Sequence, residues 1–200
     1  MTPEQISPNL ADGSIPRTPE QLFASLDQLG VPHTTVTHPP MKTVEESKTL
    51  RAPSLHGGYT KNLFLRAKTG HLMWLITCDE DRTLDLRSLA DGLNAGRLSF
   101  GSKESLMKHL GVTPGAVSPL ALINDISQAV CFVIEEQLLK HRIIHLHPLD
   151  NRRTTAIETQ DLLRFTQITG HPALGLTFSG SKGVITRTLG DIPKLDVTEI

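Results

Sequence analysis

Two apolar segments joined by a short polar turn constrain the fold of this chain more than any other feature of its sequence. Residues 60–67 and 71–78 are rich in apolar side chains, with β-branched or aromatic residues among them, and Lys68-Thr69-Gly70 separates them. Short apolar runs with a glycine in the turn between them are typical of a β-hairpin. We therefore predict two antiparallel strands, the second of which carries the only tryptophan, Trp74.

Capping residues predict several helices around this hairpin. Thr18-Pro19-Glu20-Gln21 is a capping box with proline at the first helical position, and Gly30 provides the stop, so a helix is expected over residues 19–29. Further helices are expected from Thr43, from Asp85 to near Gly96, from Ser102 to Gly111 and over residues 159–168.

Strand patterns alternate with these helices. The expected strands cover residues 33–38, 97–100, 120–123, 129–135, 142–147 and 154–157. The sequence thus predicts an α/β or α+β fold, with a mixed sheet and helices packed around it.

The length of 200 residues is enough for one well-buried core, and no change in composition requires two domains. Residues 1–17 are expected to form a loosely ordered arm, residues 18–172 the domain, and residues 173–200 a tail with one edge strand at 173–178. Both cysteines, Cys78 and Cys131, lie in apolar stretches and are expected to behave as small core residues.

Composition limits the classes of partner. The N-terminus lacks the pattern of a signal peptide, and no segment approaches the run of about 18 apolar residues that spans a bilayer, so a cytoplasmic location and no membrane partner are expected. The formal net charge is −1, which argues against a broad grip on nucleic-acid phosphates. DNA binding is disfavoured because there is no basic recognition helix.

One polar pair opens the first strand of the hairpin. Gly57-Gly58 permits a close approach of another backbone segment, and Lys61-Asn62 follows at the start of a strand otherwise built for burial. The pair is either an ordinary solvated strand end or the lining of a pocket for a polar substrate.

A second candidate is the loop that joins the helix ending at Gly111 to the next apolar run. Its residues Gly115, Ala116, Val117, Ser118 and Pro119 form either a simple connection or a set of backbone N–H donors for a carbonyl or phosphate oxygen.

Histidines provide the third and fourth candidates. His145 and His147 lie on one face of a strand, but no third ligand is evident, and a hydrogen-bonding or acid–base role for His147 is favoured over a metal site. His38 precedes Pro39-Pro40, while Glu45 and Glu46 are adjacent and do not share a helix face. The sequence has no nucleophile elbow, P-loop or dinucleotide-binding glycine pattern.

Several of these blocks, taken in their order, resemble the YbaK/ProX superfamily of aminoacyl-tRNA editing domains, and more closely its free-standing prolyl-tRNA editing branch. The blocks are His38-Pro39-Pro40 with Thr43-Val44-Glu45-Glu46, residues 60–65, the loop 115–119, Leu122-Ile123-Asn124-Asp125, and residues 147–151 with Thr154-Thr155. Arg152-Arg153 departs from the small residues of relatives, and it either adds a phosphate contact or has no role.

The resemblance implies a partly closed mixed sheet flanked by helices, a small pocket for the aminoacyl end of tRNA, and no metal or cofactor. It implies that Lys61 is the key polar residue, that Asn62 and His147 line the pocket, and that the loop 115–119 shapes it. His38 and Val44 are expected to contact substrate on the same basis.

The function implied is hydrolysis of the ester of alanine mischarged onto tRNA for proline. Only the acceptor end of the tRNA would be held, with prolyl-tRNA synthetase or an elongation factor as further expected partners. The alternatives are a deacylase for cysteinyl-tRNA or another small amino acid, and a non-catalytic module that binds aminoacyl-tRNA or a synthetase.

Overall fold

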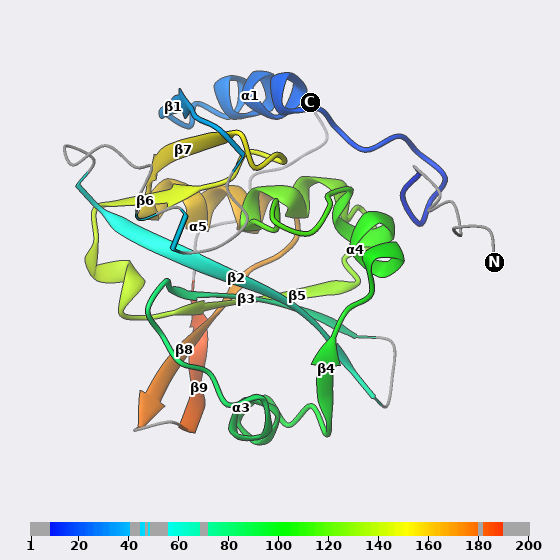
Figure 1. Ribbon diagram of the computed structural model, residues 1–200, viewed down its shortest axis with the longest axis vertical. Coiled ribbons are helices and arrows are strands. Elements are labelled where there is room, and N and C mark those ends of the chain that lie inside the picture. The colour runs from blue at the N-terminus through cyan, green and yellow to red at the C-terminus, as the bar shows by residue number, and fades with distance from the viewer. Residues whose placement is uncertain are drawn as a thin grey trace.

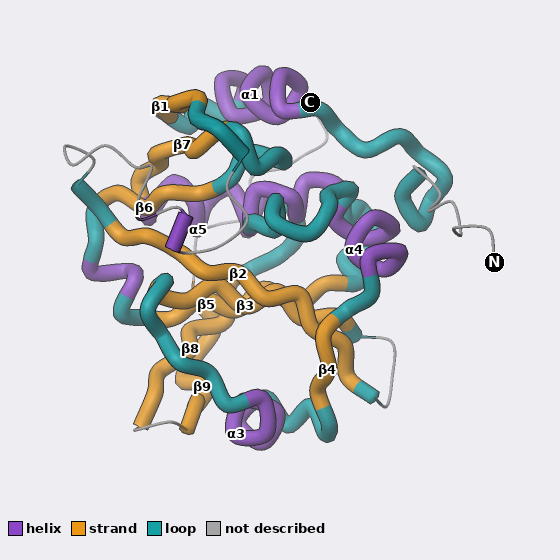
Figure 2. Tube along the Cα trace, in the orientation of Figure 1, coloured by secondary structure: helices purple, strands orange, loops and turns teal. Residues whose placement is uncertain are grey.

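The fold was analysed in a computed structural model, which describes residues 9–40, 45–46, 48, 56–68, 72–179 and 182–189. Helices and strands alternate along the chain, as predicted (Figures 1 and 2). Their order is α1 (Pro19–Gln28), β1 (His33–Thr37), β2 (Gly58–Ala67), β3 (Met73–Asp79), α3 (Leu86–Gly92), β4 (Leu98–Phe100), α4 (Lys103–Leu110), η1 (Pro119–Asn124), β5 (Val130–Glu135), η2 (Leu138–Lys140), β6 (Ile143–Leu146), β7 (Arg153–Glu158), α5 (Thr159–Ile168), β8 (Ala173–Ser179) and β9 (Lys182–Leu189).

Local capping explains where the helices begin. The side chain of Thr18 accepts a hydrogen bond from the Gln21 N–H, and the Gln21 side chain accepts one from the Thr18 N–H, which completes the predicted capping box of α1. Asp85 caps α3 and Ser102 caps α4 in the same way. The helix expected from Thr43 lies largely outside the described residues, although residues 45, 46 and 48 are helical.

The sheet is mixed, and β2 is the strand that joins its two halves. Eight strands follow the order β1-β7-β6-β2-β3-β5-β8-β9, and β4 pairs with β2 off this path. The predicted hairpin is present, because β2 and β3 pair antiparallel from Thr60↔Asp79 to Arg66↔Met73. The pairs β2–β6, β3–β5 and β5–β8 are parallel, so the predicted mixed sheet is confirmed.

Side chains on the two faces of the sheet enter two separate cores. Phe64 of β2 and Phe132 of β5 pack with α1, α4, α5 and η1 in the larger core. Leu65 and Val133, one residue further along the same strands, pack with α3 in the smaller core. The α4 and α5 helices therefore lie on one side of β2, β3 and β5, and α3 lies on the other (Figure 1).

Two expectations about strands are wrong. Residues 120–123 form part of the 3-10 helix η1 instead of a strand, because Ser118 caps it, Pro119 sits in its first turn, and Leu120, Ala121 and Leu122 are all fully buried. The tail strand is not at an edge: β8 pairs parallel with β5, and β9, which was not expected, forms the edge beyond it.

The segment expected to be a loose arm has contacts at residues 9–17. The Ala11 N–H donates to the Lys108 carbonyl of α4, and the Arg17 N–H donates to the Asn124 side chain of η1. Leu10 is buried. In the part of the chain that the structure describes, no helix is long and apolar enough to cross a membrane.

Candidate functional site

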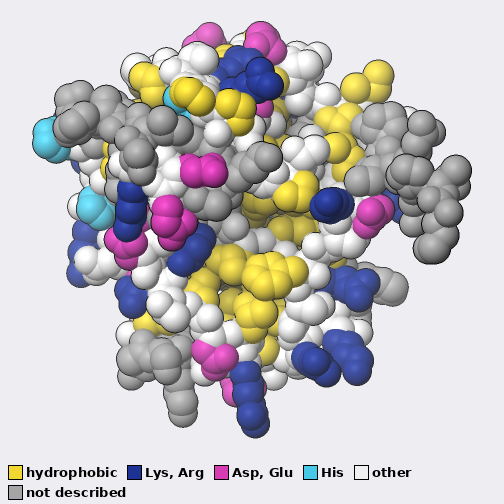
Figure 3. Space-filling model, in the orientation of Figure 1, with side chains coloured by type: hydrophobic (Ala, Val, Ile, Leu, Met, Phe, Trp, Pro, Cys, Tyr) yellow, Lys and Arg dark blue, Asp and Glu magenta, His cyan; other side chains and the backbone are white. Residues whose placement is uncertain are grey.

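The edge of β2 changes partner halfway along, and the change leaves an opening. Gly58 and Tyr59 pair with β6, and residues 65–67 pair with β4. Between them, among the described residues, no strand pairs with this edge of β2 from Thr60 to Leu63. Hydrophobic side chains gather at the centre of this face of the molecule, over the middle of β2 (Figure 3).

Gly57 and Gly58 permit the close approach of β2 to β6 that the sequence predicted. A Cβ atom at Gly57 would lie 2.7 Å from the Ile143 carbonyl oxygen, and one at Gly58 would lie 2.9 Å from the His141 ring. The next residue, Tyr59, stacks on His145 with ring centroids 4.5 Å apart. The junction of the two halves of the sheet is therefore packed tightly where the opening begins.

Lys61 is half-buried on the face of β2 that carries Leu65. Its ammonium group donates to the Glu80 carbonyl oxygen at 3.2 Å and to the Arg82 carbonyl oxygen, both in the turn after β3. Lys48 forms an ion pair with Asp81 of the same turn. An ammonium group has three N–H donors, so one donor of Lys61 is left without an acceptor among the residues that the structure describes.

Asn62 faces the other side of β2, because successive residues of a strand point to opposite faces. Its side-chain oxygen accepts a hydrogen bond from Thr77 Oγ1 at 2.7 Å, and Thr77 is fully buried. Thr60, on the same face, donates to the His145 carbonyl oxygen of β6 at 3.1 Å. Lys61 and Asn62 therefore lie on opposite faces of β2.

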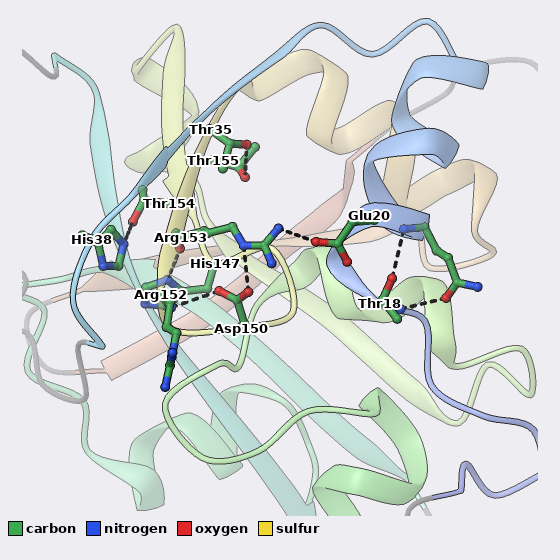
Figure 4. A network of polar contacts seen from close by, with 11 residues as sticks. Thr18, Glu20, Thr35, His38, His147, Asp150, Arg152, Arg153, Thr154 and Thr155 are labelled. Carbon is green, nitrogen blue, oxygen red and sulfur yellow. Dashed lines mark hydrogen bonds and ion pairs between the residues drawn. The ribbon is translucent and has the colours of Figure 1, made fainter.

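His147 and His38 lie side by side at the ends of β6 and β1 (Figure 4). Their ring centroids are 6.1 Å apart. His38 Nδ1 is 2.8 Å from the Pro39 carbonyl oxygen, and its Nε2 is 2.9 Å from Thr154 Oγ1, so both ring nitrogens are engaged. The carbonyl can only accept, so Nδ1 of His38 carries a proton and donates it to that oxygen, and the Thr154 hydroxyl is the partner of Nε2.

Burial sets the protonation state of His147. Burial lowers the pKa of His147 below its ordinary value, and nearby His38 lowers it further, against a hydrogen bond to the Arg153 carbonyl that raises it. His147 Nδ1 lies 2.9 Å from that carbonyl oxygen and must donate to it. Nε2 of the neutral ring is then a lone-pair acceptor, and it has no protein partner within the described residues.

An ion-pair network holds the turn between β6 and β7 beside these histidines (Figure 4). Arg153 donates to Glu20 of α1 at 2.8 Å, contacts Asp150 at 3.0 Å, and its guanidinium lies 5.9 Å from the centre of the Phe23 ring. Arg153 is thus used to attach the turn to α1. The Arg152 side chain is exposed and is drawn pointing away from the network.

The loop 115–119 belongs to the larger core. Gly115 adopts a positive φ of 95°, Ala116 is buried, and Val117 packs against the core that also contains Leu146 of β6. The Ala116 N–H donates to Thr113, whereas, among the described residues, nothing accepts from the N–H groups of Val117 and Ser118. Val117 is partly exposed, so its N–H can reach an oxygen atom of a ligand, whereas Ser118 is fully buried.

The structure thus brings some predicted residues together and separates others. His38 and His147 are neighbours, Asn62 is linked to β6 through Thr60, and Lys61 lies on the opposite face of β2. Val44 lies outside the described residues. A cavity of about 470 Å³ lies between α3 and β4, and its lining contains none of these residues.

Three polar partners were missed by sequence reasoning. Thr77 hydrogen-bonds Asn62, Thr154 hydrogen-bonds His38, and the turn from Asp79 to Arg82 holds the Lys61 ammonium group. The observed hairpin register places Thr77 opposite Asn62, whereas the three-residue turn expected from the sequence would have placed Ile76 there. No local signal in the sequence indicates the other two.

Comparison with known proteins gives consistent matches over most of the chain. The aminoacyl-tRNA editing domain matches residues 38–165. The prolyl-tRNA editing protein ProX of Acetoanaerobium sticklandii is 33% identical over 152 residues, which are 76% of this chain and 92% of that protein. A prolyl-tRNA synthetase associated domain-containing protein 1 of Danio rerio is 36% identical over 161 residues, or 80% of this chain and 86% of that protein.

A solved structure agrees at the level of the fold. The crystal structure of a candidate trans-editing enzyme for prolyl tRNA synthetase superposes with a TM-score of 0.61 at 20% identity, covering 80% of this chain and 97% of that one. The order of motifs, the mixed sheet and these matches agree, and the chain belongs to the aminoacyl-tRNA editing domain family.

Proposed function

We propose that this protein hydrolyses the ester bond of alanine mischarged onto tRNA for proline, acting on the tRNA after its release from the synthetase. The observation that carries the proposal is the state of His147: a neutral imidazole with Nδ1 fixed by the Arg153 carbonyl and Nε2 left as an acceptor. Such a group can take a proton from a hydroxyl or a water molecule near neutral pH.

Hydrolysis of an aminoacyl ester needs only modest catalytic assistance from the protein because the ester is already activated. Water, which the neighbouring ribose hydroxyl of the terminal adenosine helps to place, attacks the carbonyl carbon; the ester C–O bond breaks, the ribose oxygen takes up a proton, and the free amino acid is released. His147 Nε2 accepts the proton of the attacking group and returns it to the leaving oxygen. No covalent protein nucleophile is required.

The developing oxyanion needs donors that are fixed in advance. The N–H group of partly exposed Val117 has no acceptor within the described residues, and there the Lys61 ammonium group has a third donor beyond the two carbonyls that hold it. In this proposal the ammonium group of Lys61, which lies on the opposite face of β2 from Asn62, reaches the terminal nucleotide across the open edge of the strand and orients it by a charge-assisted hydrogen bond. Asn62 and His38 contribute to the position of the terminal adenosine.

Selection of alanine over proline follows from size. A synthetase pocket that accepts proline rejects a smaller amino acid by only about 1–3 kcal/mol per missing methylene, so a second site that excludes proline is the general remedy. The loop 115–119, closed by buried Ala116 and Pro119, is the wall proposed to exclude it.

The near-zero net charge fits a protein that holds only the acceptor end of its tRNA. The names of similar proteins refer to prolyl-tRNA editing and to association with prolyl-tRNA synthetase, and both support tRNA for proline and its synthetase as partners.

The test is ester hydrolysis of alanyl-, prolyl- and cysteinyl-tRNA under excess enzyme, with wild type beside Lys61→Ala and His147→Ala. Lys68→Ala, an exposed lysine at the end of the same strand, is the matched control. Loss of alanine alone, reduced at least tenfold by the two site substitutions and not by the control, is the expected result. Cysteine loss would instead favour a related specificity, and no loss from any substrate would favour a binding module.

A further inference from the structure

The Lys61 ammonium group is held by a turn that belongs to another strand. Its two hydrogen-bond acceptors are the carbonyl oxygens of Glu80 and Arg82, which follow β3. Backbone carbonyls move only when their peptide units rotate, so the position of the ammonium group depends on the conformation of this turn. Whatever fixes the turn therefore fixes Lys61.

Glu135, the last residue of β5, contacts both ends of that turn. One carboxylate oxygen accepts the Asp79 N–H at 3.0 Å, and the other accepts the Arg82 Nε–H at 3.0 Å together with Arg82 Nη2. The residue is only 2% exposed. The Arg82 guanidinium also lies 4.8 Å from the centre of the Phe178 ring, which packs it from the side of β8.

A carboxylate at this depth is costly to bury unless its hydrogen bonds are satisfied. Here they are satisfied by the turn itself, through one backbone N–H and two N–H groups of the planar guanidinium, an arrangement that fixes direction as well as distance. The carboxylate thus restrains both Asp79 and Arg82. The two carbonyl groups that hold Lys61 belong to Arg82 itself and to Glu80, which lies between Asp79 and Arg82 in the chain.

We propose that Glu135, acting through Arg82, is a positioning residue for the Lys61 ammonium group. The proposal rests on the proposed function for the role of Lys61 in catalysis, but the positioning itself is a structural property that is measured without any substrate. Glu135 touches no substrate in this scheme; it acts through the turn.

The first arm of the test uses NMR of protein labelled with ¹³C-lysine. Lys61→Arg assigns the Lys61 Cε cross-peak, and its position is compared in wild type, Glu135→Gln and Arg82→Lys. We expect the Lys61 cross-peak to shift in both variants while that of Lys68 stays in place. Glu158→Gln, which breaks the exposed ion pair with Arg142, is the control and leaves Lys61 unchanged.

The substitutions are chosen to separate positioning from folding. Glu135→Gln keeps an oxygen for the Asp79 N–H and loses the charge that Arg82 requires. Arg82→Lys changes the more exposed partner of the pair, since the Arg82 side chain is 33% exposed. It keeps the positive charge but removes the planar guanidinium, whose two N–H groups bind the carboxylate together. If Glu135→Gln does not fold, both the NMR comparison and the kinetic comparison are made with Arg82→Lys alone. An unshifted Lys61 cross-peak in a folded variant overturns the proposal, whatever the enzyme's activity.

The second arm is kinetic. Because small displacements of a catalytic group cost up to about a hundredfold in rate, we expect Glu135→Gln to lower kcat by about 10- to 100-fold with little change in KM. In a Lys61→Ala background the same substitution should lower kcat no further, since there is no ammonium group left to position. If the double variant instead shows the product of the two single-variant losses in kcat, Glu135 and Lys61 act independently and the proposed coupling between them is refuted. A wild-type protein without hydrolytic activity would refute the proposed function, and the NMR arm would still decide the positioning.

Discussion

Replacement of Gly57 by alanine tests the junction on which the site is built. Gly57 has a φ of 147°, a backbone conformation that L side chains rarely adopt, and an added Cβ would lie 2.7 Å from the Ile143 carbonyl oxygen and 2.9 Å from His145 Nε2. The oxygen is part of the β6 backbone and cannot rotate away as a side chain would. The strands must separate, and in the described part of the chain the β2–β6 ladder consists of two residue pairs, Gly58↔Ile144 and Tyr59↔His145.

The expected cost combines two effects of similar size. Backbone strain at such a residue costs about 1–3 kcal/mol, and forcing packed groups apart costs about 1–3 kcal/mol more. We expect the free energy of unfolding to fall by about 3 kcal/mol, measured by urea denaturation with Trp74 fluorescence. Gly30→Ala is the control: Gly30 also has a positive φ, of 61°, but nothing lies within 4 Å of the added Cβ, so it should cost about 1–2 kcal/mol.

The functional consequence is measured under conditions where both variants are folded. The Tyr59–His145 stack and the start of the opening in the β2 edge move with the junction, so kcat/KM for alanyl-tRNA should fall in Gly57→Ala and stay near wild type in Gly30→Ala. Equal losses of stability in the two variants would show that β6 does not press on Gly57, and the account of the junction would be wrong.

Three further predictions follow from the protonation and burial of single residues. Because burial lowers the pKa of His147, kcat/KM should stay constant near pH 7 and fall only when the pH drops below about 6.5, and a fall that begins above pH 7 would contradict this. Burial raises the pKa of Asp125, but hydrogen bonds from His171, Ser127 and the backbone outweigh it and leave the pKa lowered, so its contribution to stability is present above pH 4 and is lost on acidification. Asp125→Asn should therefore cost about 2 kcal/mol at pH 7 and less at pH 3 in thermal or urea unfolding. Burial raises the pKa of the Cys78 thiol to about 12, so iodoacetamide at pH 8 should label Cys78 only after denaturation, as measured by mass spectrometry.

Local chemistry in the sequence was sufficient for most elements. The Thr18–Gln21 capping box, the Asp85 and Ser102 caps and the alternation in the hairpin each depend on residues within a few positions of one another, and each is present in the structure. The motifs around Lys61, the loop 115–119 and His147 identified the family for the same reason: each is a short block of sequence that can be recognised without knowing where it lies in the fold.

Other features could not be inferred from neighbouring residues. The apolar run 120–123 suits a strand by composition, but it is surrounded by core on all sides and is capped by Ser118, and burial without a strand partner favours the 3-10 helix. The sequence of the tail is polar and rich in glycine, which does not suggest an internal strand. β8 is nevertheless internal because it pairs parallel with β5, about 40 residues earlier in the chain.

The sequence by itself determined most of the elements, the family and the residue types of the candidate site, because these depend on short-range patterns. The period of a strand even required Lys61 and Asn62 to face opposite sides of β2. Tertiary structure decided the environment of each residue there. Burial lowers the pKa of His147 and favours its neutral form. Thr154 hydrogen-bonds His38, Thr77 hydrogen-bonds Asn62, and the buried carboxylate of Glu135 restrains the turn that holds Lys61. Those contacts join segments tens of residues apart, and only folding brings them within hydrogen-bond distance.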